Sequence, residues 1–292
     1  KITRHLKDAG FNDGEIIYAF DSTGDAKGFA VLKALYPTET PVQILTRLMA
    51  TPSRPVYSTH KLICGLKQEF PELKYSEIIL IIRDAGEDLG NIIDWLQMVN
   101  YEGAYYLGLP KADLDDLASI LGSREERDLK LGTRKTSYIL SGFGYSVEEV
   151  VYWAKYANFS SYEVFKILLD YWAGMVGSDK IIEQLKAMES NGYTLIELAE
   201  AVIAYYREGK LPPGSGSAYL VENPYSTASN TMRILAGLGK KMPDVVTAMI
   251  HAGIAPRYMI NALHSYWYDR YYWKEPMPGH YDHTSDEFAL LN

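Results

Sequence analysis

Two histidines and an aspartate lie close together near the C-terminal end of the sequence. His280, Asp282 and His283 offer two imidazoles and a carboxylate, which are ligand types that zinc binds. Ligands so close in the sequence, with no cysteine or further histidine beside them, make a poor zinc site. We therefore expect neither a metal nor a cofactor, and these three residues are the weak metal candidates of the sequence.

Acidic side chains also occur in close groups, at Asp113, Asp115 and Asp116 and at Glu148 and Glu149. A glycosidase needs two carboxylates that face each other across a cleft, but a solvated acidic helix face has the same composition. The sequence contains no nucleophile elbow, P-loop, dinucleotide-binding glycine motif or HExxH motif. We therefore expect a non-enzymatic protein, with a glycan hydrolase as the second alternative.

Four further features bear on the function. Cys64 is the only cysteine, so no internal disulfide can form, and its place on an apolar helix face predicts a core thiol. Asn158 begins an Asn-Phe-Ser sequon and is a candidate glycosylation site. A net charge of −8 argues against a nucleic-acid partner. No apolar run reaches the length of a membrane span.

The elements that carry these residues are predicted by a phrase that occurs four times: GFNDGEII (10–17), GYSVEEVV (144–151), NFSSYEVF (158–165) and GYTLIELA (192–199). Each copy holds an aromatic, then a helix-capping residue, and a glutamate three positions after the cap. This is a capping box, and the aromatic can pack as a hydrophobic staple on the next helical turn. The preceding Gly or Asn suits the left-handed residue that ends a helix. The predicted cap and staple residues are Phe11, Asn12, Glu15, Tyr145, Ser146, Glu149, Phe159, Ser160, Glu163, Tyr193, Thr194 and Glu197.

A longer repeat contains these turns. Residues 132–172 align without a gap on residues 227–267, with 11 of 41 positions identical. Partial copies begin near residues 28 and 57. The self-similarity predicts an all-α fold, an array of short capped helices in three-helix repeats, either α-solenoid-like or a compact helical superhelix.

The predicted organisation has four parts. A helical repeat array spans 1–208 and begins inside a repeat, and a Gly/Pro/Ser-rich linker covers 209–226. A terminal helical repeat spans 227–270. Residues 271–292 form an extended aromatic tail.

An array that opens on an incomplete repeat exposes apolar helix faces at its start. We expect the terminal repeat or tail of another copy to cover them, which gives a head-to-tail homopolymer or filament. A tail that folds back on its own array is the alternative. The expected interface residues are Ile2, Leu6, Tyr266, Trp267, Tyr271, Tyr272, Trp273, Phe288, Leu290 and Leu291.

Tyrosine is unusually frequent, at 24 of 292 residues. Tyrosine side chains favour interfaces, and their rings also stack on sugars. A helical-repeat module that binds protein or carbohydrate is therefore the first alternative to self-assembly.

The turn phrase, as in AGFNDGEI and GYSVEEV, resembles the "AGYS" helical-hairpin repeats of some large bacterial surface and phage-tail-associated proteins. This resemblance implies a structural or assembly role and carries over no functional residue. The sequence begins at Lys1 without an initiator methionine, which is expected of a processed product or of a fragment. If a signal peptide was removed, the protein is extracellular or at the cell surface, and this is the location we expect. An intracellular or virion-associated location stays open.

Overall fold

A computed structural model describes residues 1–21, 27–51, 57–99, 108–122, 129–171, 178–208 and 224–274. The side chains at 171, 178, 179 and 268–274 are not part of that description. The metal candidates His280, Asp282 and His283 lie outside the described residues. So do Phe288, Leu290 and Leu291 of the expected interface and residues 209–223 of the predicted linker.

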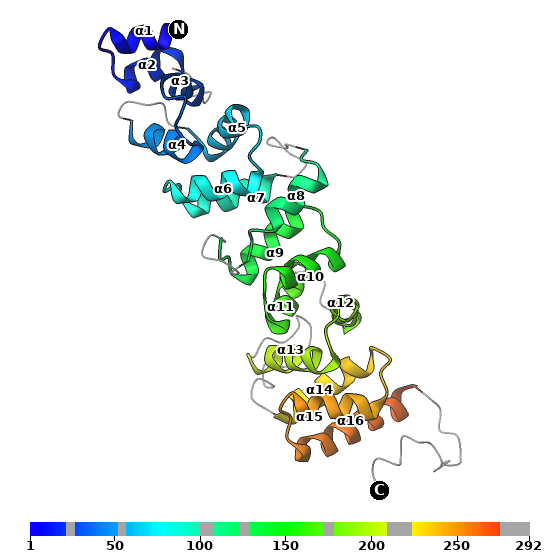
Figure 1. Ribbon diagram of the computed structural model, residues 1–292. Coiled ribbons are helices and arrows are strands. Elements are labelled where there is room, and N and C mark those ends of the chain that lie inside the picture. Colours follow the sequence, from blue (N-terminus) through cyan, green and yellow to red (C-terminus); the bar gives the residue numbers. More distant parts are fainter. Residues whose placement is uncertain are drawn as a thin grey trace. The chain divides into compact units, whose positions relative to one another are not determined.

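The all-α prediction is confirmed, since the described residues form helices and no strand (Figure 1). The first helices are α1 (Ile2–Asp8), α2 (Asp13–Phe20), α3 (Gly28–Leu35), α4 (Pro41–Ala50), α5 (Thr59–Glu69), α6 (Tyr75–Asp84), α7 (Leu89–Met98) and α8 (Lys111–Ala118). After α9 (Thr133–Gly142) follow α10 (Val147–Tyr156), α11 (Ser161–Tyr171), α12 (Ser178–Ser190), α13 (Leu195–Arg207), α14 (Pro224–Ala236), α15 (Met242–His251) and α16 (Pro256–Lys274). None of these helices is both long enough and apolar enough to cross a membrane.

The chain forms two compact units. The first holds Lys1–Leu131 and Ile139–Gly144, and the second holds Gly132–Tyr138 and Tyr145–Asn292, so α9 contributes to both. The predicted linker at 209–226 stays a prediction, because the structure describes only its last three residues, which already belong to α14.

Within each unit, a helix packs mainly against the next helix and the one after that. In the first unit α1, α3, α5 and α7 make successive contacts, and so do α4, α6 and α8. In the second unit the two rows are α10, α12, α14, α16 and α11, α13, α15. Contacts limited to near neighbours in the sequence are those of a stacked helical array, which is the predicted fold class.

The two long copies of the repeat have matching helices. Helices α10 and α15 both contain ten residues and begin 95 positions apart, at Val147 and Met242, which is also the spacing between the starts of α11 and α16. The same core positions are buried in both copies, including Ile139 and Ile234, and Leu140 and Leu235. The alignment made from sequence therefore reflects a shared structure.

The turns follow one geometric rule. Each of the nine described residues with a left-handed backbone stands three positions before a helix begins: Gly10, Gly86, Gly108, Lys130, Gly144, Asn158, Gly192, Gly239 and Gly253. After α1, the N–H of Gly10 donates to the Lys7 carbonyl and the N–H of Phe11 to the Leu6 carbonyl, which is a Schellman motif. Five described turns have this pair of bonds, so one short segment ends a helix and starts the next.

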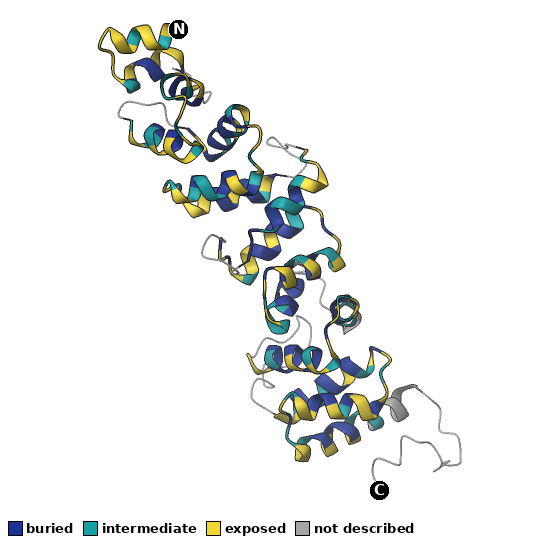
Figure 2. Ribbon diagram, viewed as in Figure 1, coloured by how far each residue is buried: buried dark blue, intermediate teal, exposed yellow. Residues whose placement is uncertain are grey.

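Capping boxes are present at all four copies of the phrase. At α13 the backbone N–H of Thr194 donates to Glu197 at 2.7 Å, and this bond holds the pKa of Glu197 below its usual value. The aromatic before the cap is buried at Tyr145 and Tyr193 and half-buried at Phe159. Phe11 differs, because 47% of its surface is exposed. Helix α1, at the N-terminus in Figure 2, likewise has no buried residue.

Candidate functional site

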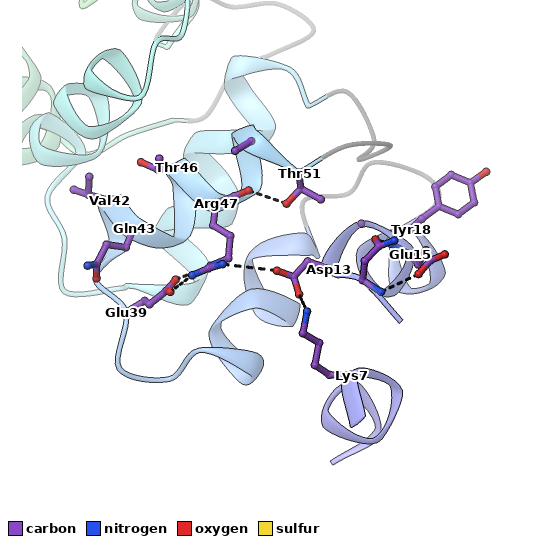
Figure 3. Close-up of a pocket in the computed structure, with 13 residues that line it drawn as sticks. Lys7, Asp13, Glu15, Tyr18, Glu39, Val42, Gln43, Thr46, Arg47 and Thr51 are labelled. Atoms are coloured by element: carbon purple, nitrogen blue, oxygen red, sulfur yellow. Dashed lines mark hydrogen bonds and ion pairs between the residues drawn. The ribbon is translucent and has the colours of Figure 1, made fainter. Parts of the chain in front are cut away.

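A groove of about 1100 Å³ lies in the first unit between α2 and α4. The residues that line it include Gly14 and Tyr18 on α2 and Val42 and Thr46 on α4. Figure 3 shows Val42 and Thr46 together on α4. Tyr18 and Val42 are 58% and 45% exposed, so this groove is accessible to a ligand. We refer to it below as the α2–α4 groove.

Four charged side chains cross the floor of the groove in one network. Lys7 of α1 donates to Asp13 of α2 at 2.8 Å, and Arg47 of α4 lies 3.9 Å from the other Asp13 oxygen. Arg47 also donates to Glu39, with 3.0 Å between Nε and Oε2. Figure 3 shows Lys7 and Arg47 converging on Asp13 from opposite sides. Both cations of the groove are therefore already paired with carboxylates.

Tyr36 contacts two members of this network. The hydroxyl of Tyr36 donates to Asp13, 3.0 Å from Oδ2, and the Arg47 guanidinium lies 3.9 Å from the centre of the Tyr36 ring. The hydrogen bond to Glu39 raises the pKa of Arg47, and the hydrogen bond to Asp13 raises the pKa of Lys7. Each shift favours the charged form of the cation.

Two capping boxes place amide groups at the edge of the groove. The Asn12 side-chain oxygen accepts from the N–H of Glu15 at 3.0 Å, and the Gln43 side-chain oxygen accepts from the N–H of Thr40 at 2.8 Å. Because both oxygens are fixed by the helix starts, the orientation of each amide is fixed too. The NH₂ groups of Asn12 and Gln43 have no hydrogen-bond partner among the described residues, and both side chains line the groove.

The three carboxylates of the groove have structural partners. Asp13 accepts from Lys7 and Tyr36, Glu39 accepts from Arg47, and Glu15 accepts from the backbone N–H of Asn12. A carboxylate that acts as a general acid or nucleophile must be able to reach the substrate. The groove is therefore better suited to binding a ligand, through its hydrogen-bond donors and its aromatic ring, than to acid–base catalysis.

A second cavity of about 510 Å³ lies between α5 and α7. His60 lines it, and Trp95 donates from Nε1 to His60 Nδ1 at 3.3 Å. The neutral imidazole therefore carries its proton on Nε2, the nitrogen 3.6 Å from the Cys64 sulfur. A protonated Nε2 cannot take the thiol proton, so this pair is not arranged as a cysteine nucleophile and its base.

The prediction that Cys64 is a core residue is wrong. Cys64 is exposed on the outer face of α5, beside His60 one turn earlier. Partial desolvation of its sulfur nevertheless raises the pKa of the thiol. A thiol with a raised pKa is a poor nucleophile at neutral pH.

No protein-family model, curated protein or solved structure matches this chain. Its function is therefore argued from the geometry of its own surfaces.

The predicted interface residues are only partly described. At the start of the chain Ile2 is 68% exposed and Leu6 is half-buried, and α1 contains no buried side chain. At the other end Tyr266 and Trp267 are half-buried in α16, with their rings edge to face at 5.8 Å. The backbones of Tyr271, Tyr272 and Trp273 continue α16, but their side chains lie outside the description.

The remaining predicted residues have structural neighbours. Asp116 accepts from the backbone and the hydroxyl of Ser76, at 2.9 and 2.7 Å, and Glu149 serves the capping box of α10. Asn158 is exposed, but its backbone is the left-handed residue of a Schellman turn. Among the described residues, no three His, Cys, Asp or Glu side chains are grouped to hold a metal.

An exposed aromatic group on α10 is a feature that the sequence analysis did not single out. Tyr152, Trp153 and Tyr156 contact one another, with ring centres 5.1 Å apart for Tyr152–Trp153 and 5.4 Å apart for Trp153–Tyr156. The matching positions of α15 are Thr247, Ala248 and His251. The repeat fold therefore does not require aromatic residues at these three positions. This difference between the two aligned repeats is the sequence signal that could have identified the aromatic group.

The α2–α4 groove was also missed. One signal in the sequence points to it, because Gly14 is the second residue of α2, and the other three stapled helices have Glu148, Tyr162 and Ile196 at that position. Glycine inside a helix costs about 0.5 to 1 kcal/mol relative to alanine. Here it leaves the groove wall without a side chain.

Proposed function

We propose that this protein is a non-enzymatic assembly protein that associates with copies of itself through α1 and the turn that follows it. The observation that carries the proposal is that α1 has seven residues and buries no side chain. Isolated helices of that length are marginal in water, and most helical stability in proteins comes from packing of an apolar face. A partner surface over α1 supplies that packing.

The apolar side chains of this region face outward. Ile2 and Phe11 are 68% and 47% exposed, and Leu6 is half-buried. We define these three residues as the N-terminal apolar surface. Single exposed apolar residues are ordinary on soluble proteins, whereas adjacent ones mark interaction sites.

The proposed partner is the terminal repeat or tail of a second copy. Helix α16 is the last helix of its row in the second unit and carries Ile260, which is 64% exposed, together with half-buried Tyr266 and Trp267. A contact between two different surfaces of identical chains propagates into rings or filaments. We also propose that the protein acts outside the cell or at the cell surface.

The test compares two substitutions at equivalent helix positions. Ile2 and Leu89 are each the first residue of a helix, α1 and α7, and both are exposed aliphatic residues. Aspartate is favourable in a first helical turn, so neither Ile2→Asp nor Leu89→Asp should unfold its helix. We expect the wild type and Leu89→Asp to assemble as concentration rises, and Ile2→Asp to remain monomeric, in sedimentation velocity and electron micrographs.

A monomeric wild type at every concentration, or equal assembly of both variants, would contradict the proposal. Phe11→Asp provides a second test within the same surface and should also prevent assembly. Removal of residues 275–292 then assigns the partner. Loss of assembly identifies the tail, and retained assembly that Ile260→Asp abolishes identifies α16.

A further inference from the structure

The α2–α4 groove combines features that suit one class of ligand. Tyr18 presents an exposed aromatic ring at its rim, and Asn12 and Gln43 present amide donors along its edge. The flat face of an aromatic ring packs on the C–H face of a sugar, while amide groups donate to sugar hydroxyls. From this geometry we infer that the groove binds an uncharged oligosaccharide.

The amide donors are oriented before any ligand arrives. Asn12 and Gln43 hold their oxygens at the N–H groups of Glu15 and Thr40, at 3.0 and 2.8 Å, so that each NH₂ group is turned away from its helix. Rigid polar groups lose little conformational entropy on binding, which favours affinity. The capping boxes therefore orient the two amide groups of the binding site.

Charge in the groove selects against ionic ligands. Lys7 and Arg47 are paired with Asp13 and Glu39, so the charges of these four side chains sum to zero. Glu15 adds a further negative charge to the lining. A neutral ligand with many hydroxyls can use the donors and acceptors without breaking these pairs.

The groove also has the space that a sugar chain needs. Its volume of about 1100 Å³ is near the upper end of the range of about 300 to 1,000 Å³ for ligand pockets. Gly14 contributes to that space, because each of the other stapled helices has a larger side chain at the equivalent position. Helix α2 therefore differs from the other stapled helices at Gly14, a residue that lines the α2–α4 groove.

The test uses variants that keep the fold and change the groove. Asparagine and aspartate cap helices equally well, and glutamate replaces glutamine in a capping box. Asn12→Asp and Gln43→Glu therefore preserve both helix starts while replacing the NH₂ donors with oxygens. Tyr18→Ala removes the aromatic ring.

Tyr18→Ala and Asn12→Asp each have a matched control outside the groove. Tyr152 occupies the position in α10 that Tyr18 occupies in α2, six residues after the cap, and is 52% exposed. Ser146→Asp changes the cap of α10 and adds the same charge as Asn12→Asp. Circular dichroism and thermal unfolding of every variant, including the double variant Asn12→Asp/Gln43→Glu, verify that the fold is retained.

Maltohexaose, cellohexaose and chitohexaose serve as probes in saturation-transfer NMR and calorimetry with the full chain. We expect saturable binding of at least one probe. Tyr18→Ala and the double variant Asn12→Asp/Gln43→Glu should each weaken it by about tenfold or more, the effect of losing one good contact. Tyr152→Ala and Ser146→Asp should bind like the wild type.

Three results would overturn the inference. The first is no saturable binding of any probe, and the second is wild-type affinity in folded Tyr18→Ala and in the folded double variant. The third is saturable binding of an unstructured Gly/Ser/Thr-rich peptide in place of the sugars, which would make the groove a peptide site. Since Ile2→Asp leaves the groove lining unchanged, binding measured on that variant separates this inference from self-assembly.

Discussion

At the scale of single residues, the structure shows how polar groups are tolerated inside the array. Asp21 is 1% exposed and accepts from the Tyr57 hydroxyl at 2.7 Å and from the Gly28 N–H at 3.1 Å. A buried carboxylate requires such donors, because its desolvation is otherwise costly. Gly28 is also a steric requirement, since a Cβ there would lie 2.6 Å from the Tyr57 oxygen.

Two buried tyrosines give the second unit a pH dependence. Burial raises the pKa of Tyr193 and of Tyr206 to about 12, from an ordinary value of about 10. Each tyrosine therefore contributes its full stability below about pH 10 and loses it as the pH rises to about 12. The loss amounts to about 2 to 3 kcal/mol per tyrosine, because one pKa unit corresponds to 1.36 kcal/mol.

We expect the urea midpoint of the second unit to fall as the pH rises from about 10 to about 12. Tyr193→Phe and Tyr206→Phe should each remove part of that fall. Tyr193 has no hydrogen-bond partner for its hydroxyl among the described residues, so Tyr193→Phe should cost little at neutral pH. Unfolding followed by circular dichroism at several pH values measures both effects. Variants that keep the full wild-type pH dependence would refute this explanation.

At the scale of elements, the turns explain why the helices begin and end where they do. A left-handed residue ends one helix, and three positions later the next helix begins, as at Gly144 and Val147 or Gly239 and Met242. A second turn type joins α3 to α4 and α5 to α6, through five residues that begin Tyr36-Pro37 and Phe70-Pro71. Proline cannot continue the helix, so it fixes these ends as well.

Two equivalent glycines give a prediction at this scale: Gly142 is the last residue of α9, and Gly237 is the first residue after α14. A Cβ on Gly142 would lie 2.8 Å from the backbone oxygen of Gln97, whereas a Cβ on Gly237 would meet the end of the Ile182 side chain, at 2.4 Å. A backbone oxygen cannot move aside, but a side chain can adopt another rotamer. We expect Gly142→Ala to cost about 1 to 3 kcal/mol of unfolding free energy.

Gly237→Ala should cost less than Gly142→Ala, because the Ile182 side chain can move aside. Urea unfolding of the two variants in parallel provides the measurement. Equal losses, or a larger loss for Gly237→Ala, would show that the approach of α9 to α7 is not as close as the structure describes.

At the scale of the whole molecule, the array distributes its stability locally. Helices contact their first and second neighbours in the sequence, and each unit has its own core. Stability in such an array is approximately a sum of repeat and nearest-neighbour terms. A local defect should therefore stay local.

Leu235→Ala tests this property. Leu235 is fully buried in α14, and truncation to alanine at such a position costs about 2 to 5 kcal/mol. Hydrogen exchange measured by mass spectrometry should accelerate in the neighbours α12, α13, α15 and α16. Exchange in α3 to α6 should be unchanged, and acceleration there would show a single cooperative molecule instead.

The sequence by itself determined the helices and their turns. Caps such as Asn12 and Ser146, and left-handed residues such as Gly192, act on backbone groups within a few positions of themselves, so their effect can be read along the chain. Only the tertiary structure decided which faces are covered. Phe11 and Tyr145 stand in the same phrase, yet Phe11 is exposed and Tyr145 is buried, because burial depends on the helix that packs alongside. For the same reason the α2–α4 groove, whose lining comes from three helices, was not apparent until those helices were placed together.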